Sequence, residues 1–350
     1  MKDFSKYIIS DNSTIHNAIC QLNELMTKPL VLFVVSDKQE MVGSITDGDI
    51  RRHLVKEGKL DDNVTLAMNK NFHFIQGNID VLQIKEYKNC KVGLLPYLNE
   101  DKTIQRVLNF ETKKTVLPID AVLMAGGKGE RLRPLTENCP KPLLEIGNRA
   151  IIDYNIENLL NNGVEHISVT VNYLKEQLEA HFSNPMKDGV KVNCVREPKF
   201  LGTIGAVKFV ETIHNDTVLV MNSDLFTNID LESFYIHFYK NNADMSVATV
   251  PYSVNIPFGV FEIENIREII GIKEKPSYHY QANAGIYLIK KSVLDLVPQD
   301  EFFNATDLIE KIIEQKGRVI RYPISGYWID VGNPADFQKA QDFAKHINGL

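Results

Sequence analysis

The sequence predicts an α/β protein whose larger part has a Rossmann-like, mostly parallel mixed sheet and whose first third is a small α+β arrangement. Three observations support this class. From residue 119 onward, short apolar segments alternate with amphipathic ones, as in parallel sheets covered by helices. Residues 13–52 instead follow the order helix, strand, strand, helix. A chain of 350 residues is also long for one domain, so we expect two.

The first third is predicted to hold one α+β unit and a weaker copy of it. A Ser/Thr start and apolar spacing at Ile15, Ala18 and Leu22 predict a helix over 13–24. Residues 30–46 read as two strands around a polar turn, and a helix opens at 47–58. In the copy we expect a helix over 78–87, a strand over 91–98 and a helix over 101–110. The charged segment 111–118 ends in Pro118 and is the predicted boundary, which gives domains 1–115 and 116–350.

The second part begins with the alternating segments and becomes rich in strands toward its end. We expect strands at 119–125, 166–172, 190–197 and 217–224, separated by helices at 151–163, 174–182 and 203–213. Four further strand-like segments follow at 245–252, 259–265, 267–275 and 284–291. Together these segments predict an α/β domain with additional strands, and we expect the functional site to lie in this domain.

Composition excludes several classes of function. The net charge of −6 argues against broad binding of nucleic acid or anionic membranes, so an anion site must be local. The four cysteines form no CxxC pair, and the nine histidines form no HxH or HExxH pattern, which disfavours a zinc site and a disulfide framework. The N-terminus lacks a signal-peptide pattern, and no apolar run is long enough to span a bilayer. We therefore expect a cytoplasmic, reduced protein.

A glycine-rich turn follows the first strand of the second part. Gly126, Gly127 and Gly129 would let the backbone approach a phosphate and direct N–H groups toward it. The turn is not a Walker A loop, and Leu132 stands where a dinucleotide fingerprint needs its third glycine.

Cations follow the same turn and make a phosphate site more specific. Arg131 can donate bidentate hydrogen bonds to phosphate oxygens. Lys141, which stands between two prolines, can act as a point charge. Together with the glycines, these residues suit a triphosphate. A tight turn with solvated cations is the less favoured alternative.

The stretch GGKGERLRPLTENCPKPLLEIGN, residues 126–148, resembles the signature of sugar-1-phosphate nucleotidyltransferases. Further motifs of that family follow in order, namely LGTIGAV (201–207), NSD (222–224), PFGV (257–260), EKP (274–276), NAGIY (283–287) and YWIDVGNPADF (327–337). The resemblance covers about two thirds of the chain, from Ile119 to the end. It implies an enzyme with a nucleotidyltransferase (GT-A-like) fold that joins an NTP and a sugar 1-phosphate into an NDP-sugar and pyrophosphate.

The resemblance also implies roles for residues at the matching positions. The backbone of the three glycines would cradle the nucleotide, Arg131 would hold the departing phosphates, and Lys141 would contact the reacting centre. The other implied residues are two Mg²⁺ ligands, Asp224 and Asp330; contacts to base and ribose, Gly202 and Thr203; and a sugar-phosphate pocket of Gly259, Glu274, Lys275 and Asn283. Glu130 departs from the family pattern, which has Thr there, and we expect its carboxylate to turn away from the phosphates.

In the first third, MVGSITDGDIRRHL (41–54) resembles the CBS motif, a small module that pairs to bind purine nucleotides. Thr46 and Asp49 match the residues that hold ribose hydroxyls in that family. The weaker copy lacks such an Asp, so one nucleotide site is expected at most. Two alternatives stay open: an Asp here caps the helix, or the pair is an architectural element that forms a homo-oligomer.

Three classes of function compete at this stage. The favoured class is an active nucleotidyltransferase. Within it the chain resembles the PtmE-like glucosamine-1-phosphate guanylyltransferases, and this resemblance makes GTP the first choice. Thymidylyl- or uridylyltransfer to glucose 1-phosphate is the alternative within the class. The second class is a non-catalytic, nucleotide-sensing regulator. It is disfavoured because such a protein would not need to keep both predicted metal carboxylates, Asp224 and Asp330. The third class is a glycosyltransferase. It is disfavoured because these enzymes generally bind their metal through a DxD motif, whereas this chain has NSD.

Overall fold

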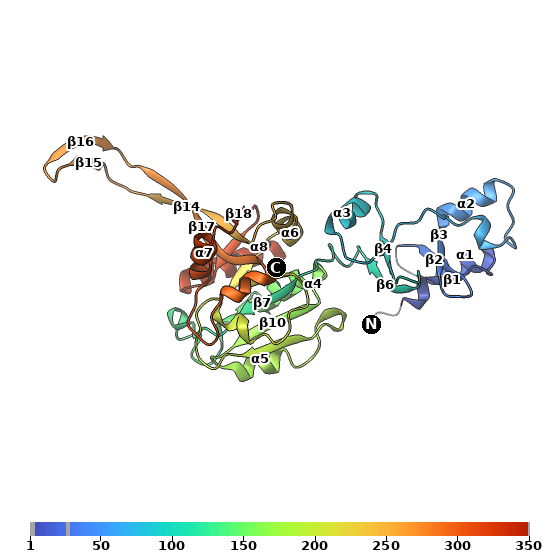
Figure 1. Ribbon diagram of the computed structural model, residues 1–350, viewed down its shortest axis with the longest axis horizontal. Helices are drawn as coiled ribbons and strands as arrows, with labels where there is room; N and C mark the ends of the chain where they lie inside the picture. The colour runs from blue at the N-terminus through green and yellow to red at the C-terminus, as the bar shows by residue number, and fades with distance from the viewer. Residues whose placement is uncertain (1–3, 26–28, 349–350) are drawn as a thin grey trace. The chain divides into compact units, whose positions relative to one another are not determined.

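The structure is a computed structural model that describes residues 4–25 and 29–348 (Figure 1), and the chain divides into two compact units. Unit 1 comprises residues 1–118 with the short segments 160–164 and 187–189. Unit 2 comprises residues 119–159, 165–186 and 190–350. No helix among the described residues is long and apolar enough to cross a membrane.

Unit 1 contains two three-stranded sheets with the same pairing pattern. In each sheet the first two strands are parallel and the last two antiparallel. The first sheet is β1 (Ile8–Ser10), β2 (Val31–Val35) and β3 (Met41–Thr46), with α1 (Ile15–Glu24) and α2 (Asp47–Val55). The second is β4 (Ile75–Gln76), β5 (Leu94–Leu98) and β6 (Ile104–Asn109), with α3 (Val81–Asn89).

The predicted helices over 13–24, 47–58 and 78–87 and the strands over 30–46 and 91–98 are confirmed. The α1 helix forms because Thr14 caps its first turn and Ile15, Ala18 and Leu22 are buried on one face. The predicted helix over 101–110 is wrong, because these residues form strand β6. Antiparallel pairing with β5 and burial of Leu108 determine the state of this segment, which is too short for local propensity to decide.

Unit 2 is built on a seven-stranded mixed sheet in the order β11-β10-β7-β12-β17-β14-β18. The first four strands are mutually parallel, β17 is antiparallel to both of its neighbours, and β14 is parallel to β18. The strands are β7 (Asp120–Met124), β10 (His166–Val171), β11 (Val192–Arg196), β12 (Thr217–Asn222), β14 (Met245–Asn255), β17 (Ser277–Lys290) and β18 (Val319–Pro323). The predicted α/β class with a mostly parallel sheet is therefore confirmed for this unit.

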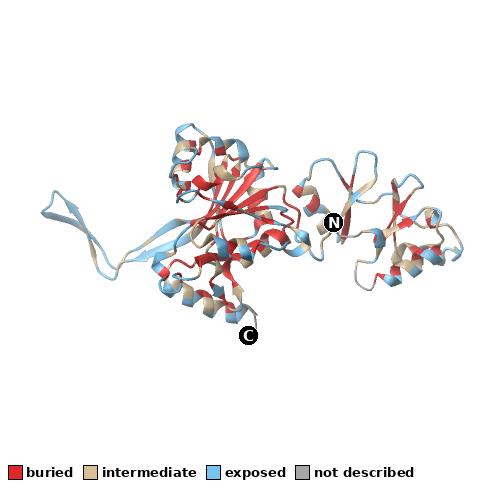
Figure 2. Ribbon diagram, turned by 90° about the horizontal axis from the view of Figure 1, so that it is seen from below, coloured by how far each residue is buried: buried red, intermediate tan, exposed pale blue. Residues whose placement is uncertain are grey.

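Helices enclose the buried strands of this sheet (Figure 2). They are α4 (Ile151–Asn161), α5 (Lys175–His181), α6 (Leu231–Lys240), α7 (Ala305–Glu314) and α8 (Pro334–Asn348). The helix predicted over 203–213 is reduced to a 3-10 segment, Gly205–Phe209. The amides of Ile204 and Gly205 both donate to the carbonyl of Phe303, so this stretch is tied to a distant loop and cannot extend as a helix.

Two short ribbons and one long one complete unit 2. The ribbon β8 (Glu145–Ile146) with β9 (Arg149–Ala150) precedes α4, and β13 (Leu225–Thr227) pairs with β19 (Trp328–Asp330). The outer halves of β14 and β17 leave the sheet together and continue into β15 (Val260–Glu264) and β16 (Glu268–Lys273) (Figure 1).

Candidate active site

A pocket of about 650 Å³ opens where strands β7 and β12 end. Parallel strands present their carboxyl ends at one edge of a sheet, and ligands of open α/β sheets bind there. The lining of this pocket comes from the glycine-rich turn and from loops that follow the parallel strands. The lining residues are Met124, Ala125, Gly126, Gly127, Lys128, Gly129, Glu130, Arg131, Lys141, Pro142, Asn172, Glu197, Phe200, Gly202, Thr203, Asn222, Ser223, Asp224 and Gly332.

The glycine-rich turn is shaped by contacts that only glycine permits. Gly129 has φ of 64°, and its carbonyl accepts a 2.8 Å hydrogen bond from the buried hydroxyl of Thr136. A Cβ on Gly126 would collide with the carboxylate of Glu197, whereas a Cβ on Gly127 would meet nothing. Leu132 anchors the turn in an apolar cluster with α8. The turn is thus held open toward the pocket.

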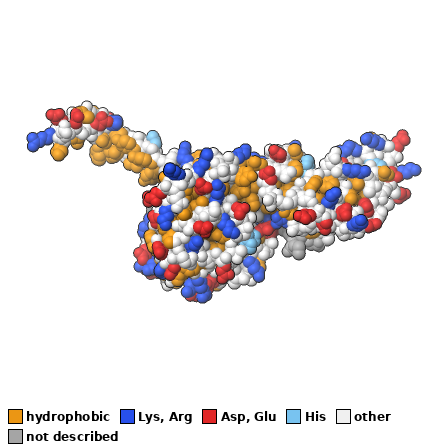
Figure 3. Space-filling model, in the orientation of Figure 1, with side chains coloured by type: hydrophobic (Ala, Val, Ile, Leu, Met, Phe, Trp, Pro, Cys, Tyr) orange, Lys and Arg blue, Asp and Glu red, His pale blue; other side chains and the backbone are white. Residues whose placement is uncertain are grey.

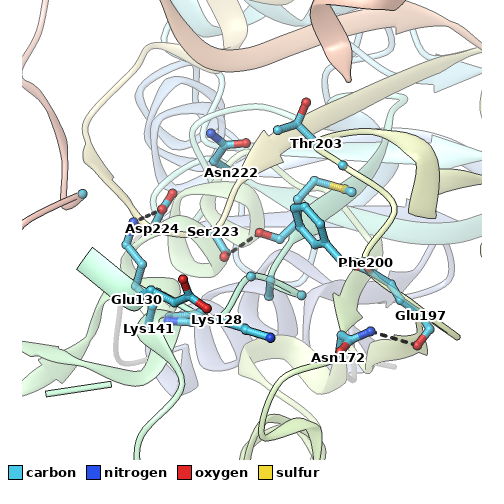
Figure 4. Close-up of a pocket in the computed structure, with 18 of the residues that line it drawn as sticks. Lys128, Glu130, Lys141, Asn172, Glu197, Phe200, Thr203, Asn222, Ser223 and Asp224 are labelled. Carbon is cyan, nitrogen blue, oxygen red and sulfur yellow. Dashed lines mark hydrogen bonds and ion pairs between the residues drawn. The ribbon is translucent and has the colours of Figure 1, made fainter. Parts of the chain in front are cut away.

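Lys141 and two aspartates meet at one side of the pocket. The Lys141 ammonium contacts Asp224 (Figure 4). It also lies 3.9 Å from Asp330. Lys141 is buried in the 3-10 segment Lys141–Leu143, between Pro140 and Pro142. Asp330 lies opposite Leu225 in the β13–β19 pair, which brings the carboxylate beside the end of β12. Burial raises the pKa of Asp330, and the charge of Asp224 adds to the rise, whereas Lys141 and Arg131 lower it.

The two aspartates are suitable ligands for a divalent cation. Asp224 Oδ1 is buried and has no hydrogen-bond partner among the described residues, which is costly for a carboxylate unless a ligand fills the gap. Mg²⁺ is commonly held by one or two carboxylates, with substrate phosphates and water completing its shell. Asp224 and Asp330 therefore fit such a site.

Glu197 and Asn172 lie at the other side of the pocket (Figure 4). Asn172 follows β10, Glu197 follows β11, and Asn172 Nδ2 donates to the Glu197 carbonyl at 3.2 Å. Glu197 is only 6% exposed, its Oε2 has no partner among the described residues, and burial raises its pKa. Our sequence analysis missed both residues, although their positions directly after two parallel strands were a usable signal.

The structure brings eight of the sequence-predicted site residues to the pocket wall. They are Gly126, Gly127, Gly129, Arg131, Lys141, Gly202, Thr203 and Asp224. Asp330 lies just beyond the lining, beside Gly332. Glu130 is exposed and is among the residues that line the pocket, and the direction of its carboxylate relative to the phosphates stays a prediction.

Four predicted sugar-pocket residues lie outside this lining. Gly259, Glu274 and Lys275 lie on the long ribbon made of the outer halves of β14 and β17 together with β15 and β16. Glu274 and Lys275 are exposed. Asn283 is exposed at the base of that ribbon, where it donates to the Tyr287 hydroxyl and accepts from the Gly285 amide. The pocket of this structure is thus lined by residues that the sequence predicts to contact the nucleotide and the metal, and by none of the four predicted to contact the sugar.

In unit 1, Thr46 and Asp49 form the capping box of α2. Thr46 Oγ1 accepts from the Asp49 amide at 3.3 Å, and Asp49 Oδ2 accepts from the Thr46 amide at 2.9 Å. Arg52 pairs with the other Asp49 oxygen at 2.5 Å. The capping interpretation is confirmed, and nucleotide binding at these residues stays a prediction.

Comparison with known proteins places unit 2 in a family. Residues 120–346 match the Nucleotidyl transferase family model, so the chain belongs to that family. It is 33% identical over 232 residues to the bifunctional protein GlmU of Methanocaldococcus jannaschii, with 64% of this chain and 54% of that protein covered. The chain thus spans about half the length of this relative.

Two further similarities cover nearly the whole of the other protein. The chain is 30% identical over 233 residues to the D-glycero-alpha-D-manno-heptose 1-phosphate guanylyltransferase of Aneurinibacillus thermoaerophilus, covering 65% of this chain and 99% of that one. The crystal structure of HddC from Yersinia pseudotuberculosis superposes with a TM-score of 0.51 at 25% identity, again over 65% and 99%. The first third of the chain lies outside the family match.

Proposed function

We propose that the protein transfers a nucleoside monophosphate from an NTP to a sugar 1-phosphate, releasing pyrophosphate. The observation that carries the proposal is the convergence of the glycine-rich turn, Arg131, Lys141 and two carboxylates at one sheet edge in a member of this family. A phosphate oxygen of the sugar attacks the α-phosphorus in line. The new P–O bond forms as the bond to the β-phosphate breaks, and pyrophosphate leaves.

The chain's part in this reaction is to hold two anions together and neutralise their charge. The backbone of the glycine-rich turn cradles the nucleotide, and Arg131, exposed at the pocket wall, holds the departing phosphates. Lys141 is buried and anchored, so its ammonium stays at the reacting centre. Asp224 and Asp330 would hold Mg²⁺, which supplies charge stabilisation for the transferred phosphoryl group when bound.

Guanine is the base that Glu197 suits. An ionised carboxylate only accepts hydrogen bonds, and the guanine edge offers two adjacent donors, N1–H and the 2-amino group. Uracil and thymine present one N–H between two carbonyls, which would repel the second carboxylate oxygen. Glu197 lies at the opposite side of the pocket from Lys141 (Figure 4), so its end of the pocket is suited to a base.

The proposed sugar is glucosamine 1-phosphate, which makes the product a GDP-amino sugar. The choice of glucosamine 1-phosphate rests on the resemblance to the PtmE-like branch. The choice of a guanylyl group is supported by the guanylyltransferase among the relatives, which is named for a heptose 1-phosphate. Thymidylyl- or uridylyltransfer to glucose 1-phosphate is the competing assignment. The four cysteines are free, which fits our proposal of a reducing, cytoplasmic location.

Pyrophosphate release with Mg²⁺ tests the proposal. GTP, dTTP, UTP, CTP and ATP are crossed with the 1-phosphates of glucosamine, glucose and mannose. We expect release with GTP, greatest with glucosamine 1-phosphate. Release only with UTP or dTTP would overturn the base assignment but keep the reaction class. NTP binding with no release for any pair would favour a nucleotide-sensing regulator instead.

For residues 1–115 we propose a CBS pair, joined to a nucleotidyltransferase domain at 116–350. The support is the repeated pairing pattern of its two sheets together with the CBS-like stretch 41–54. Thr46 and Asp49 would hold the ribose of a purine nucleotide at the start of α2, where a helix N-terminus favours the phosphate.

Asp49→Ala in the full chain is expected to remove the response of the transfer rate to AMP or GMP. The readout is the ratio of rates with and without the nucleotide. Asp47→Ala is the matched control, since Asp47 is in the same helical turn and pairs only with Arg51 among the described ion pairs. An Asp49→Ala protein that responds like the wild type would refute the site.

A further inference from the structure

The proposed reaction leaves one large feature of unit 2 unexplained, the two-stranded arm formed by residues 250–282. Its strands stay paired from Val250–Ala282 to Asn255–Ser277, and then from Val260–Lys273 to Glu264–Glu268. None of residues 251–283 is buried (Figure 2), and the β15–β16 end stands away from the sheet (Figure 1). None of the described residues of unit 2 covers the arm.

The arm is amphipathic in the segment next to the sheet. Tyr252 pairs with Tyr280 and Val254 with Tyr278, so four apolar side chains share one face. The other face carries Ser253 opposite His279, which are hydrogen-bonded at 2.8 Å.

The outer segment repeats this arrangement. Phe261 pairs with Ile272 and Ile263 with Ile269, which places apolar side chains on one face. Four of the alternate positions are charged, namely Glu262, Glu264, Glu268 and Lys273, and Glu262 forms a 2.6 Å ion pair with Lys273. A ribbon with one charged and one apolar face is suited to lie against another surface with its apolar face.

The apolar faces are large enough for a stable interface. Seven of their eight residues are exposed, from 40% for Val254 to 62% for Ile263, and the eighth, Tyr278, is half-buried. Figure 3 shows hydrophobic side chains gathered along the arm. At roughly 100 Å² each, these eight side chains would bury on the order of 800 Å², as much as one partner contributes to a standard-size interface. An isolated two-stranded ribbon is only marginally stable in water, so a partner surface would also stabilise the arm itself.

The pocket in the same unit has few cations, and the arm carries a further one. Its described lining has three cations, Lys128, Arg131 and Lys141, and Lys141 is already paired with Asp224. A triphosphate and a sugar phosphate together bring more charge than these cations balance. Lys275 is an exposed cation at the bend of the arm, next to Glu274, which lies close to Gly259.

The arm carries this bend outward from the sheet (Figure 1), and none of residues 250–282 lines the pocket. Continuous pairing from Thr249–Asn283 to Asn255–Ser277 makes a ribbon about 20 Å long that points outward from the sheet. Bringing the bend back would require breaking that pairing. A second copy of the chain has an equally open pocket, and Phe200 and Phe302, 56% and 58% exposed, give unit 2 an apolar patch that includes a pocket-lining residue.

We propose that two copies of this chain exchange arms, so that each pocket is completed by Glu274 and Lys275 of the other copy. The apolar face of each arm then packs around the partner's pocket, and two equivalent exchanges close a two-fold dimer. The sugar-phosphate role of these residues rests on the proposed function, whereas the dimer rests on the arm alone.

Complementation between two inactive variants tests the exchange. Asp224→Asn has a defective pocket and an intact arm, and Lys275→Ala has the reverse. Each alone should release pyrophosphate at below about 1% of the wild-type rate. Co-expressed in equal amounts, they should recover about one quarter of it, because half of the dimers are mixed and each holds one complete site. If each arm served its own pocket, no chain in the mixture would be complete, and no recovery would overturn the exchange.

Molar mass tests the dimer independently of catalysis. The wild type should be a dimer by light scattering, and Ile272→Asp, on the apolar face, should be a monomer. Glu264→Gln, on the charged face of the same segment, is the control that should remain a dimer. A monomeric wild type, or a dimeric Ile272→Asp, would overturn the proposal. A dimeric wild type with no turnover on any substrate pair would count against the proposed function alone.

Discussion

Replacing Asp224 by Asn is expected to lower kcat/KM for pyrophosphate release by about 10³-fold or more. Asn has nearly the same volume but no charge, so the pair Asp224–Asp330 would lose half of its negative charge toward Mg²⁺. Lys141 would also lose its contact partner, although Asp330 remains 3.9 Å away and keeps the buried ammonium near a carboxylate. The fold should therefore survive while turnover does not.

The measurement is initial rate against GTP and Mg²⁺ concentration, with a thermal melt to check folding. Asp342→Asn is the control, because Asp342 is an exposed residue of α8 whose carboxylate binds only surface groups. It should keep the wild-type rate. A folded Asp224→Asn protein with near-normal turnover would mean that this carboxylate neither holds the metal nor positions Lys141.

Much of unit 2 could be predicted because its signals are local. Each parallel strand is a short apolar run, and the carboxyl ends of such strands meet at one edge whatever the loop lengths. That rule alone brings the glycine-rich turn after β7 to Asp224 after β12. It would equally have found Asn172 and Glu197, had the residues after β10 and β11 been considered.

The remaining features depend on contacts between distant segments. Residues 104–109 form a strand because β5 lies beside them, and residues 203–213 lose their helix because Phe303 binds two of their amides. The same holds for Gly259, Glu274 and Lys275, whose motifs are recognisable in the sequence. Where a long hairpin carries such residues depends on how far its strands stay paired, and the sequence pattern does not contain that information.

Glu197→Gln is expected to lower kcat/KM for GTP by about 10²-fold and to reduce the preference over UTP. The amide keeps one acceptor for guanine but turns a donor toward its second N–H, and charge-assisted hydrogen bonds are worth about 1.5–3 kcal/mol each. ITP, which lacks the 2-amino group, should be a poor substrate of the wild type and should approach GTP in the variant. Glu179→Gln, on α5 and paired with Arg196, is the control that should leave base preference unchanged.

The pH dependence separates this role from a structural one. Burial raises the pKa of Glu197, so its carboxylate takes up a proton at a higher pH than an ordinary glutamate does. Only the ionised form accepts both guanine hydrogen bonds, so kcat/KM for GTP should begin to fall, as the pH is lowered, above the ordinary glutamate range. The acid limb from this group should be absent for GTP in Glu197→Gln, since an amide does not titrate there. If the acid limb were identical in both proteins, Glu197 would pack under Gly126 without reading the base.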